Sequence, residues 1–169
     1  MSRVAPVAPG TVPEAALVER RLVAARGQVS PLYRVLLNSV AAADGWEYFL
    51  TIVRQKLSLA PRLRELVILR IAVLNNAPYE FEAHVKHALA AGLTEEELGA
   101  LRSGAHDALA ALDRLVIDYT DAMTLEVHVS GALFARVEQA FAPQEVVDLT
   151  VTIGAYNMVS RVLGALGIE

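Results

Sequence analysis

The sequence PRLRELVILRIAVL, residues 61–74, decides the fold class of this chain. Pro61 suits the first turn of a helix, where a backbone N–H is not needed. The residues that follow, up to Leu74, are apolar on nearly every side of a helix. A helix of this kind lies inside a protein, with other helices packed on several of its sides. Asn75 and Asn76 predict its end.

Helix start and stop signals recur on both sides of this stretch. Before this stretch they predict a helix at 13–26 that ends at Gly27, a helix that begins at Pro31 with Ser30 as its cap, and a helix at 45–57 with Asp44 as its cap. After it they predict helices from Pro78 to Gly92, after a Thr94–Glu97 capping box, and at 108–125. Two more follow, one after Ser130 and one from Pro143 to about Leu166. The sequence has no period-two runs of the kind that strands show. It therefore predicts an all-α, single-domain helical bundle.

Length and composition fit one globular domain with an apolar surface. The chain has 169 residues, which is an ordinary size for a single domain. Prolines and a glycine interrupt the first dozen residues, so we predict a flexible N-terminal arm at 1–12 and one helical domain at 13–169. Apolar residues make up 54% of the chain and the mean hydropathy is +0.40. This apolar composition indicates a subunit interface.

Charge and cysteine content exclude several classes of function. The net charge is −4 and no basic block stands out, so we expect no nucleic-acid partner. The absence of cysteine removes disulfides, thiolate metal sites and cysteine nucleophiles. No signal peptide is visible, and the apolar run from Leu66 to Leu74 is too short to span a bilayer. We therefore predict a cytoplasmic protein with no membrane partner.

Ionisable side chains gather around the connection between the helices at 61–74 and 78–92. Glu80 and His84 are four residues apart and share a helix face, and His87 follows on the same side. A tight hairpin makes the two helices antiparallel, which brings Glu65 toward the level of His84. A carboxylate beside an imidazole orients it and raises its basicity, and a second carboxyl that stays protonated acts as an acid. The pattern predicts proton-transfer chemistry without a cofactor.

Structural interpretations of the same residues stay open at this point. Glu80 and His84 also suit a surface pair that supports the helix, and Glu65 suits an acid favoured by the helix dipole. Glu80, His84 and His87 resemble half of a carboxylate–histidine metal site. The sequence holds no second copy of that motif, so we predict no metal.

Further side chains are candidates for substrate contact. They are Tyr79, His87, Trp46 and Arg161. Core packing is the alternative for Trp46, and an ordinary salt bridge is the alternative for Arg161.

Three segments resemble the carboxymuconolactone decarboxylase/alkylhydroperoxidase D superfamily. They are PRLRELVILRIAVL at 61–74, YEFEAHV at 79–85 and ALAAGLTEEEL at 88–98. The match runs from about Leu57 to Leu101, and YNMVSRVLGALG at 156–167 is similar to longer members. The resemblance implies a small all-α protein that forms a homo-oligomer (a dimer, trimer or hexamer) with pockets near its interfaces.

The two branches of the superfamily match this chain differently. The peroxidase branch is similar in having a glutamate, a Cys-x-x-Cys pair and a histidine: Glu65 and His84 match, but the cysteine positions fall on Ala77 and Glu80. The decarboxylase branch is similar through a Glu-x-x-x-His, matched by Glu80 and His84, although it often lacks an acid at the Glu65 position. This resemblance implies proton transfer with loss of carbon dioxide rather than thiol chemistry.

These patterns predict a cofactor-independent lyase, decarboxylase-like, acting on a small oxidised carboxylic acid or lactone. His84 is the predicted proton shuttle, Glu80 its acid/base partner and Glu65 the orienting carboxylate. The alternative is a non-catalytic oligomeric binding or scaffold protein of the same fold, and peroxide reduction ranks last because the Cys-x-x-Cys is missing. Burial of the three side chains favours the enzyme, and exposure to bulk water favours the scaffold.

Overall fold

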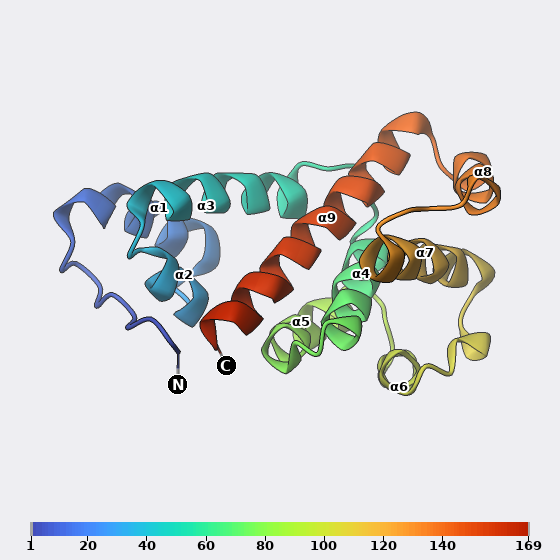
Figure 1. Ribbon diagram of the computed structural model, residues 1–169, viewed down its shortest axis with the longest axis horizontal. Coiled ribbons are helices and arrows are strands. Elements are labelled where there is room, and N and C mark those ends of the chain that lie inside the picture. Colours follow the sequence, from blue (N-terminus) through green and yellow to red (C-terminus); the bar gives the residue numbers. More distant parts are fainter. Residues whose placement is uncertain (1, 169) are drawn as a thin grey trace. The chain divides into compact units, whose positions relative to one another are not determined.

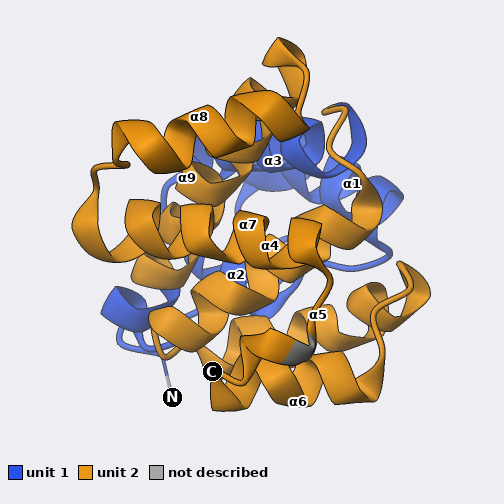
Figure 2. Cartoon of the chain, turned by 90° about the vertical axis from the view of Figure 1, so that its right-hand side faces the viewer, with its two compact units in different colours: residues 1–56, 163–169 blue, residues 57–162 orange. Residues whose placement is uncertain are grey.

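The computed structural model describes residues 2–168, apart from the side chain of Ala108, and within that range it is all-α with no strand. The contacts within the chain divide it into two compact units (Figure 2). The first unit contains residues 1–56 and 163–169, and the second contains residues 57–162. The predicted all-α fold class is confirmed. The single domain at 13–169 and the flexible arm at 1–12 stay predictions, and residues 1 and 169 lie outside the described range.

Three helices and the end of a fourth, from residue 163 on, contribute to the first unit. A 3-10 turn, η1 (Pro13–Ala15), leads into α1 (Ala16–Arg26), which is followed by α2 (Pro31–Leu36) and α3 (Val40–Gln55). Both α1 and α2 pack against α3. The core of the unit consists of Ala15, Val18, Leu22, Val29, Tyr33, Leu37 and Ala43, with Trp46 partly buried against it. The arm contacts α2, because the Val7 N–H donates to the Arg34 carbonyl at 2.8 Å.

Of the two helix caps predicted in this unit, the Asp44 cap is wrong, and the Ser30 cap is in the predicted position but lacks its side-chain hydrogen bond. α3 begins at Val40, so Asp44 lies inside the helix, where it pairs with Arg21 of α1. The alanines before Asp44 have the highest helix propensity and extend the helix toward the N-terminus. Ser30 occupies the N-cap position of α2, but its side chain makes no capping hydrogen bond.

The second unit is built around one central helix. Its elements are α4 (Pro61–Leu74), α5 (Pro78–Ala90), α6 (Glu95–Ser103), η2 (His106–Ala108), α7 (Ala111–Asp121), η3 (Ala122–Glu126) and α8 (Gly131–Ala140), followed by α9 (Pro143–Leu166), whose last residues belong to the first unit. α4 packs against α5, α6 and α7 (Figure 1). Residues 66–69 and Ile71 of α4 are fully buried. This burial confirms α4 as the interior helix that its sequence predicts.

Most helix ends in the second unit follow the sequence signals. The bounds of α4 and the start of α9 are as predicted, and the capping box of Thr94 and Glu97 and the Ser130 cap are both formed. The long helix predicted at 108–125 is confirmed at 111–121, where α7 lies, but its two ends differ. Residues 106–108 form the 3-10 turn η2, and after α7 the chain continues as the π-helical turn η3, beyond which Val127 adopts a positive φ of 67°.

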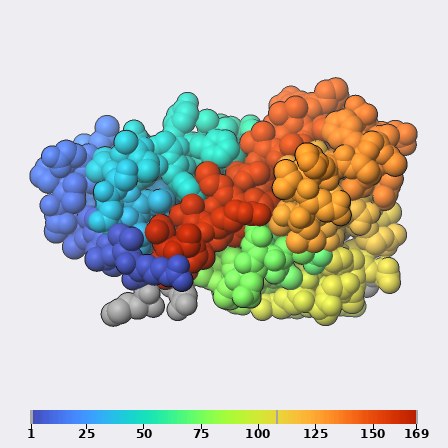
Figure 3. Space-filling view, viewed as in Figure 1, coloured from blue at the N-terminus to red at the C-terminus, as the bar shows by residue number. Residues whose placement is uncertain are grey.

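The surface of the second unit carries several apolar side chains. Leu125, Val127 and Val147 are 64%, 76% and 59% exposed. The segments that follow α7, orange in Figure 3, lie at the molecular surface. Such exposure is consistent with the subunit interface that the composition predicts, and the homo-oligomer stays a prediction.

Among the described residues, α9 is long and apolar enough, by length and composition, to cross a membrane. The core helices of globular proteins pass the same test, and Leu149, Ile153 and Tyr156 of α9 are buried. The cytoplasmic location and the absence of a membrane partner stay predictions.

Candidate active site

The connection between α4 and α5 is a short turn whose geometry the two asparagines favour. Asn76 has a φ of 50°, in the left-handed region that asparagine tolerates better than most residues. The Ala77 N–H donates to the Ala72 carbonyl at 2.8 Å, and the Asn76 N–H donates to the Val73 carbonyl at 3.2 Å. These two bonds form a Schellman motif that ends α4, and Pro78 then begins α5. The turn brings Glu65 and His84 together although 19 positions separate them.

Glu65 and His84 form a buried hydrogen-bonded pair. His84 Nδ1 lies 2.7 Å from Glu65 Oε2, and Arg64 Nε donates to Glu65 Oε1 at 3.2 Å. Glu65 is 1% exposed and His84 is 7% exposed. Burial acts to raise the pKa of Glu65, but the hydrogen bond and charge of His84, together with Arg64, hold that pKa below its ordinary value. The ionised carboxylate therefore accepts the Nδ1 proton, which leaves Nε2 as the ring nitrogen that can gain or lose a proton.

Glu80 is a buried acid on α5. It is 2% exposed, and neither of its carboxylate oxygens has a hydrogen-bond partner among the described residues. Burial raises its pKa to about 8, so its carboxyl is largely protonated at neutral pH. Glu80 lies one helical turn before His84 on the same face of α5. A buried carboxyl without a partner lowers stability, which makes it a candidate for a functional group.

Two aromatic rings enclose the imidazole of His84. The ring centroid of Tyr156, on α9, lies 5.4 Å away with the ring planes at 88°, and that of His87 lies 5.8 Å away at 56°. Tyr156 is 2% exposed. The sequence analysis did not predict the contact of Tyr156 with His84, because nothing in the sequence pairs α9 with α5 at this level.

The other predicted substrate-contact residues lie on different elements. Tyr79 lies at the start of α5, where burial raises the pKa of its hydroxyl. Trp46 belongs to the first unit and packs against the core of that unit. Arg161 is exposed on α9, and its guanidinium donates to the Asn157 carbonyl at 3.1 Å and to the Asn157 side chain. The roles of these residues in binding stay predictions.

The donor set around His84 offers a metal ion few ligands. No cluster of three or more His, Asp or Glu side chains suited to a metal ion occurs in the range 2–168. The Glu65 carboxylate is already bonded to His84 and Arg64. The arrangement suits hydrogen bonding and proton movement between a carboxylate, an imidazole and a protonated carboxyl.

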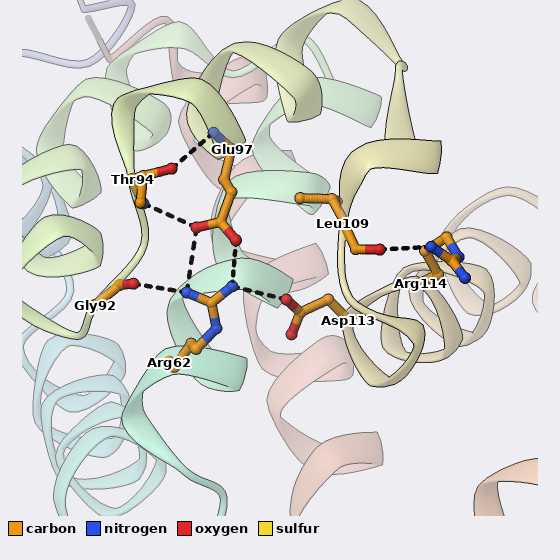
Figure 4. Close-up of polar contacts among 7 residues, drawn as sticks. All are labelled: Arg62, Gly92, Thr94, Glu97, Leu109, Asp113 and Arg114. Atoms are coloured by element: carbon orange, nitrogen blue, oxygen red, sulfur yellow. Dashed lines mark hydrogen bonds and ion pairs between the residues drawn. The ribbon is translucent and has the colours of Figure 1, made fainter.

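A second polar cluster on α4, the Arg62 cluster, differs from this site (Figure 4). The two Nη atoms of Arg62 donate to Glu97 Oε1 of α6 at 2.6 Å, to Asp113 Oδ2 of α7 at 2.7 Å and to the Gly92 carbonyl at 2.7 Å. Hydrogen bonds to Glu97 and Asp113 raise the pKa of Arg62, and the bond from Arg62 chiefly lowers that of Glu97. The cluster joins α4, α6 and α7, and its charges are paired.

Comparison with known proteins supports the fold and the family. Residues 40–116 match the model of the carboxymuconolactone decarboxylase family. A search among curated proteins found no match.

Several solved structures share the fold at low sequence identity. An Agrobacterium tumefaciens protein of unknown function, described as a candidate antioxidant defence protein AhpD, is 22% identical over 79% of this chain and 92% of its own, with a TM-score of 0.73. An uncharacterised peroxidase-related protein from Ralstonia eutropha, described as an alkylhydroperoxidase AhpD core, is 14% identical over 99% and 91%, with a TM-score of 0.84. The debrominase Bmp8, as a cysteine-to-alanine variant with 2,3,4-tribromopyrrole, is 12% identical over 100% and 91%, with a TM-score of 0.82. At these identities the three likenesses show the fold alone.

The family match at residues 40–116 and the shared fold together confirm the resemblance drawn from the sequence. Residues 40–116 of this cysteine-free chain are thus similar to the carboxymuconolactone decarboxylase family, and the chain shares the fold of the alkylhydroperoxidase D-like structures.

Proposed function

We propose that this protein is a cofactor-independent, decarboxylase-like lyase that acts by proton transfer on a small oxidised carboxylic acid or lactone. One observation carries the proposal: a buried Glu65–His84 hydrogen bond lies on the hairpin that also buries the unpartnered carboxyl of Glu80. A scaffold protein gains no stability from a buried carboxyl without a partner. The burial of all three side chains therefore favours the enzyme over the non-catalytic alternative.

Each of the three side chains has a defined task in this chemistry. Glu65 holds the Nδ1 proton of His84 and stabilises the imidazolium when Nε2 is also protonated. Glu80 keeps its proton near pH 7 and acts as the general acid. Tyr79 and His87, on the same helix, are the side chains that we assign to substrate contact.

The reaction that fits this set is loss of a carboxylate followed by protonation. The bond between the carboxylate carbon and the α-carbon of the substrate breaks, and carbon dioxide leaves. The electron pair passes into an adjacent carbonyl, which forms an enolate. The α-carbon then takes one proton from Nε2 of protonated His84, and the imidazole regains a proton through Glu80 from solvent. The overall reaction consumes one proton and releases one carbon dioxide.

The experiment is a screen of lactone acids and oxidised aromatic acids against the purified full chain. Carbon dioxide release and the shift of the thermal midpoint are both recorded for each compound. His84→Asn is the test variant, because an asparagine amide places an N–H near the position of Nδ1 and keeps a donor for Glu65. His128→Ala, an exposed histidine, is the matched control.

The proposal predicts a compound that loses carbon dioxide with the wild type and with His128→Ala but not with His84→Asn. Carbon dioxide release that His84→Asn retains in full would overturn it. If no compound in the screen is turned over or shifts the thermal midpoint, the oligomeric scaffold becomes the better account.

A further inference from the structure

The imidazole of His84 needs more than Glu65 to stay in one orientation. The terminal torsion of a histidine side chain is broad and roughly two-fold, so the ring turns over easily when nothing blocks it. Such a flip exchanges Nδ1 with a ring carbon and removes the donor that Glu65 binds. The hydrogen bond of 2.7 Å opposes the flip only while it is formed.

The ring of Tyr156 packs edge-to-face with the imidazole of His84. Its ring centroid is 5.4 Å from that of His84, and the two planes are nearly perpendicular. His87 lies against the imidazole as well, at 5.8 Å. Because Tyr156 is 2% exposed, its own ring has little room to yield.

The segment of α9 that carries Tyr156 is tied to the hairpin connection. Asn157 Oδ1 accepts from Asn75 Nδ2 at 3.0 Å, and Asn75 Nδ2 also donates to Ser160 Oγ at 2.7 Å. Asn157 Nδ2 in turn donates to Thr124 Oγ1 in η3 at 2.9 Å. Asn75 directly precedes the turn that positions α5, so these bonds fix the register of α9 against the helix that carries His84.

We propose that Tyr156 is the positioning residue of His84. Held by α9, its ring blocks the imidazole flip, which keeps Nδ1 on Glu65 and presents Nε2 as the reactive nitrogen. The reactive role of Nε2 rests on the proposed function, whereas the fixed orientation and tautomer do not.

The test records the side-chain nitrogen signals of His84 by NMR on the uniformly ¹⁵N-labelled full chain. The variants are Tyr156→Phe, which keeps the ring, and Tyr156→Leu, which removes it. Tyr156→Met is a second non-aromatic variant that stays measurable if Tyr156→Leu does not fold. Tyr119→Leu is the matched control, because Tyr119 is 3% exposed and its hydroxyl bonds to Thr150 Oγ1 at 2.9 Å.

The proposal predicts one Nδ1-protonated tautomer in the wild type, in Tyr156→Phe and in Tyr119→Leu. It predicts exchange-averaged nitrogen signals in the two non-aromatic variants. With a substrate in hand, Tyr156→Leu lowers kcat roughly tenfold and leaves KM within about threefold, since a misplaced catalytic group slows the chemical step.

Wild-type signals in Tyr156→Leu or Tyr156→Met would overturn the proposal, and so would an equal change in Tyr119→Leu. The nitrogen signals need no substrate. If the wild type has one fixed tautomer and the non-aromatic variants lose it, the positioning role of Tyr156 is supported even when the screen finds no turnover. Failure of the positioning proposal and failure of the proposed function can therefore be distinguished.

Discussion

Two polar clusters share helix α4 and differ in how completely their charges are paired. The Arg62 cluster joins α4 to α6 and α7 through charged groups that each have a partner. One turn later, Glu65 pairs with His84, while the carboxyl of Glu80 is buried without a partner in the described chain. Paired charges are typical of a structural cluster, whereas an unpaired buried acid is a candidate for a functional group. The comparison teaches that the two clusters differ in the pairing of their acids rather than in burial alone.

The largest effect, a loss of turnover, is expected when His84 is replaced. His84→Asn keeps a donor for Glu65 but has no second ring nitrogen, so it cannot move a proton to substrate. Turnover of a substrate found in the screen should fall roughly 100-fold to 10,000-fold. Steady-state kinetics beside His128→Ala checks this, and circular dichroism confirms that the variant is folded. A loss below about fivefold would remove His84 from the reaction.

Glu80→Gln should change how stability depends on pH. The folded pKa of about 8 lies above the ordinary value of 4.5, so the stability that protonated Glu80 contributes is fully present below about pH 4.5 and is lost as pH rises through 8. The loss reaches up to about 1.4 kcal/mol for each pH unit in that window. The glutamine variant lacks this loss and is the more stable protein above pH 8.

Urea unfolding at a series of pH values between 4 and 9 measures the Glu80 effect. Glu82→Gln is the control, since Glu82 is exposed and pairs with Arg102 at the surface. Parallel pH profiles for the wild type and Glu80→Gln would show that Glu80 is solvated.

Arg62→Met tests the structural role of the Arg62 cluster. The change leaves Asp113, whose side chain is 4% exposed, without its cation. Because Arg62 is itself 30% exposed, we expect a loss of about 2 kcal/mol in the free energy of unfolding rather than the full cost of a buried pair. Arg136→Met, which breaks the exposed pair with Asp118, should cost less than about 0.5 kcal/mol by the same urea measurement. Equal costs for the two variants would remove the structural role of the Arg62 cluster.

The smallest effect concerns the cap that supports this cluster. Thr94 Oγ1 accepts from the Glu97 N–H at 3.2 Å, and Glu97 Oε2 accepts from the Thr94 N–H at 2.9 Å. Thr94→Ala should lower stability by about 1 kcal/mol, whereas Thr94→Ser should retain most of it. Thermal unfolding of the two variants checks the difference, and matching midpoints would contradict the role of the cap.

Sequence patterns were sufficient for the helices whose ends carry strong local signals. Pro61 and the asparagines after Leu74 set the bounds of α4, and the same signals predicted the hairpin that joins Glu65 to His84. The predicted start of α3 is too late because Asp44 suits a helix cap. An aspartate also fits inside a helix when an arginine, here Arg21, pairs with it.

Features that depend on tertiary contact were beyond prediction. The π-helical turn η3 is stabilised by partners far along the chain, such as Asn157 to Thr124, and the local sequence shows no sign of it. The contact of Tyr156 with His84 likewise depends on how α9 lies beside α5. The sequence identified Glu80 as a candidate acid, but only the structure shows that both of its oxygens lack a partner among the described residues.

The most direct test of the proposed site is the titration of the Glu80 carboxyl itself. The chain is labelled with ¹³C at the glutamate side-chain carboxyl, and the Glu80 signal is assigned as the one missing from Glu80→Gln. The account predicts a titration midpoint of about 8. A midpoint near 4.5 would mean a solvated, ordinary carboxylate and would contradict the account.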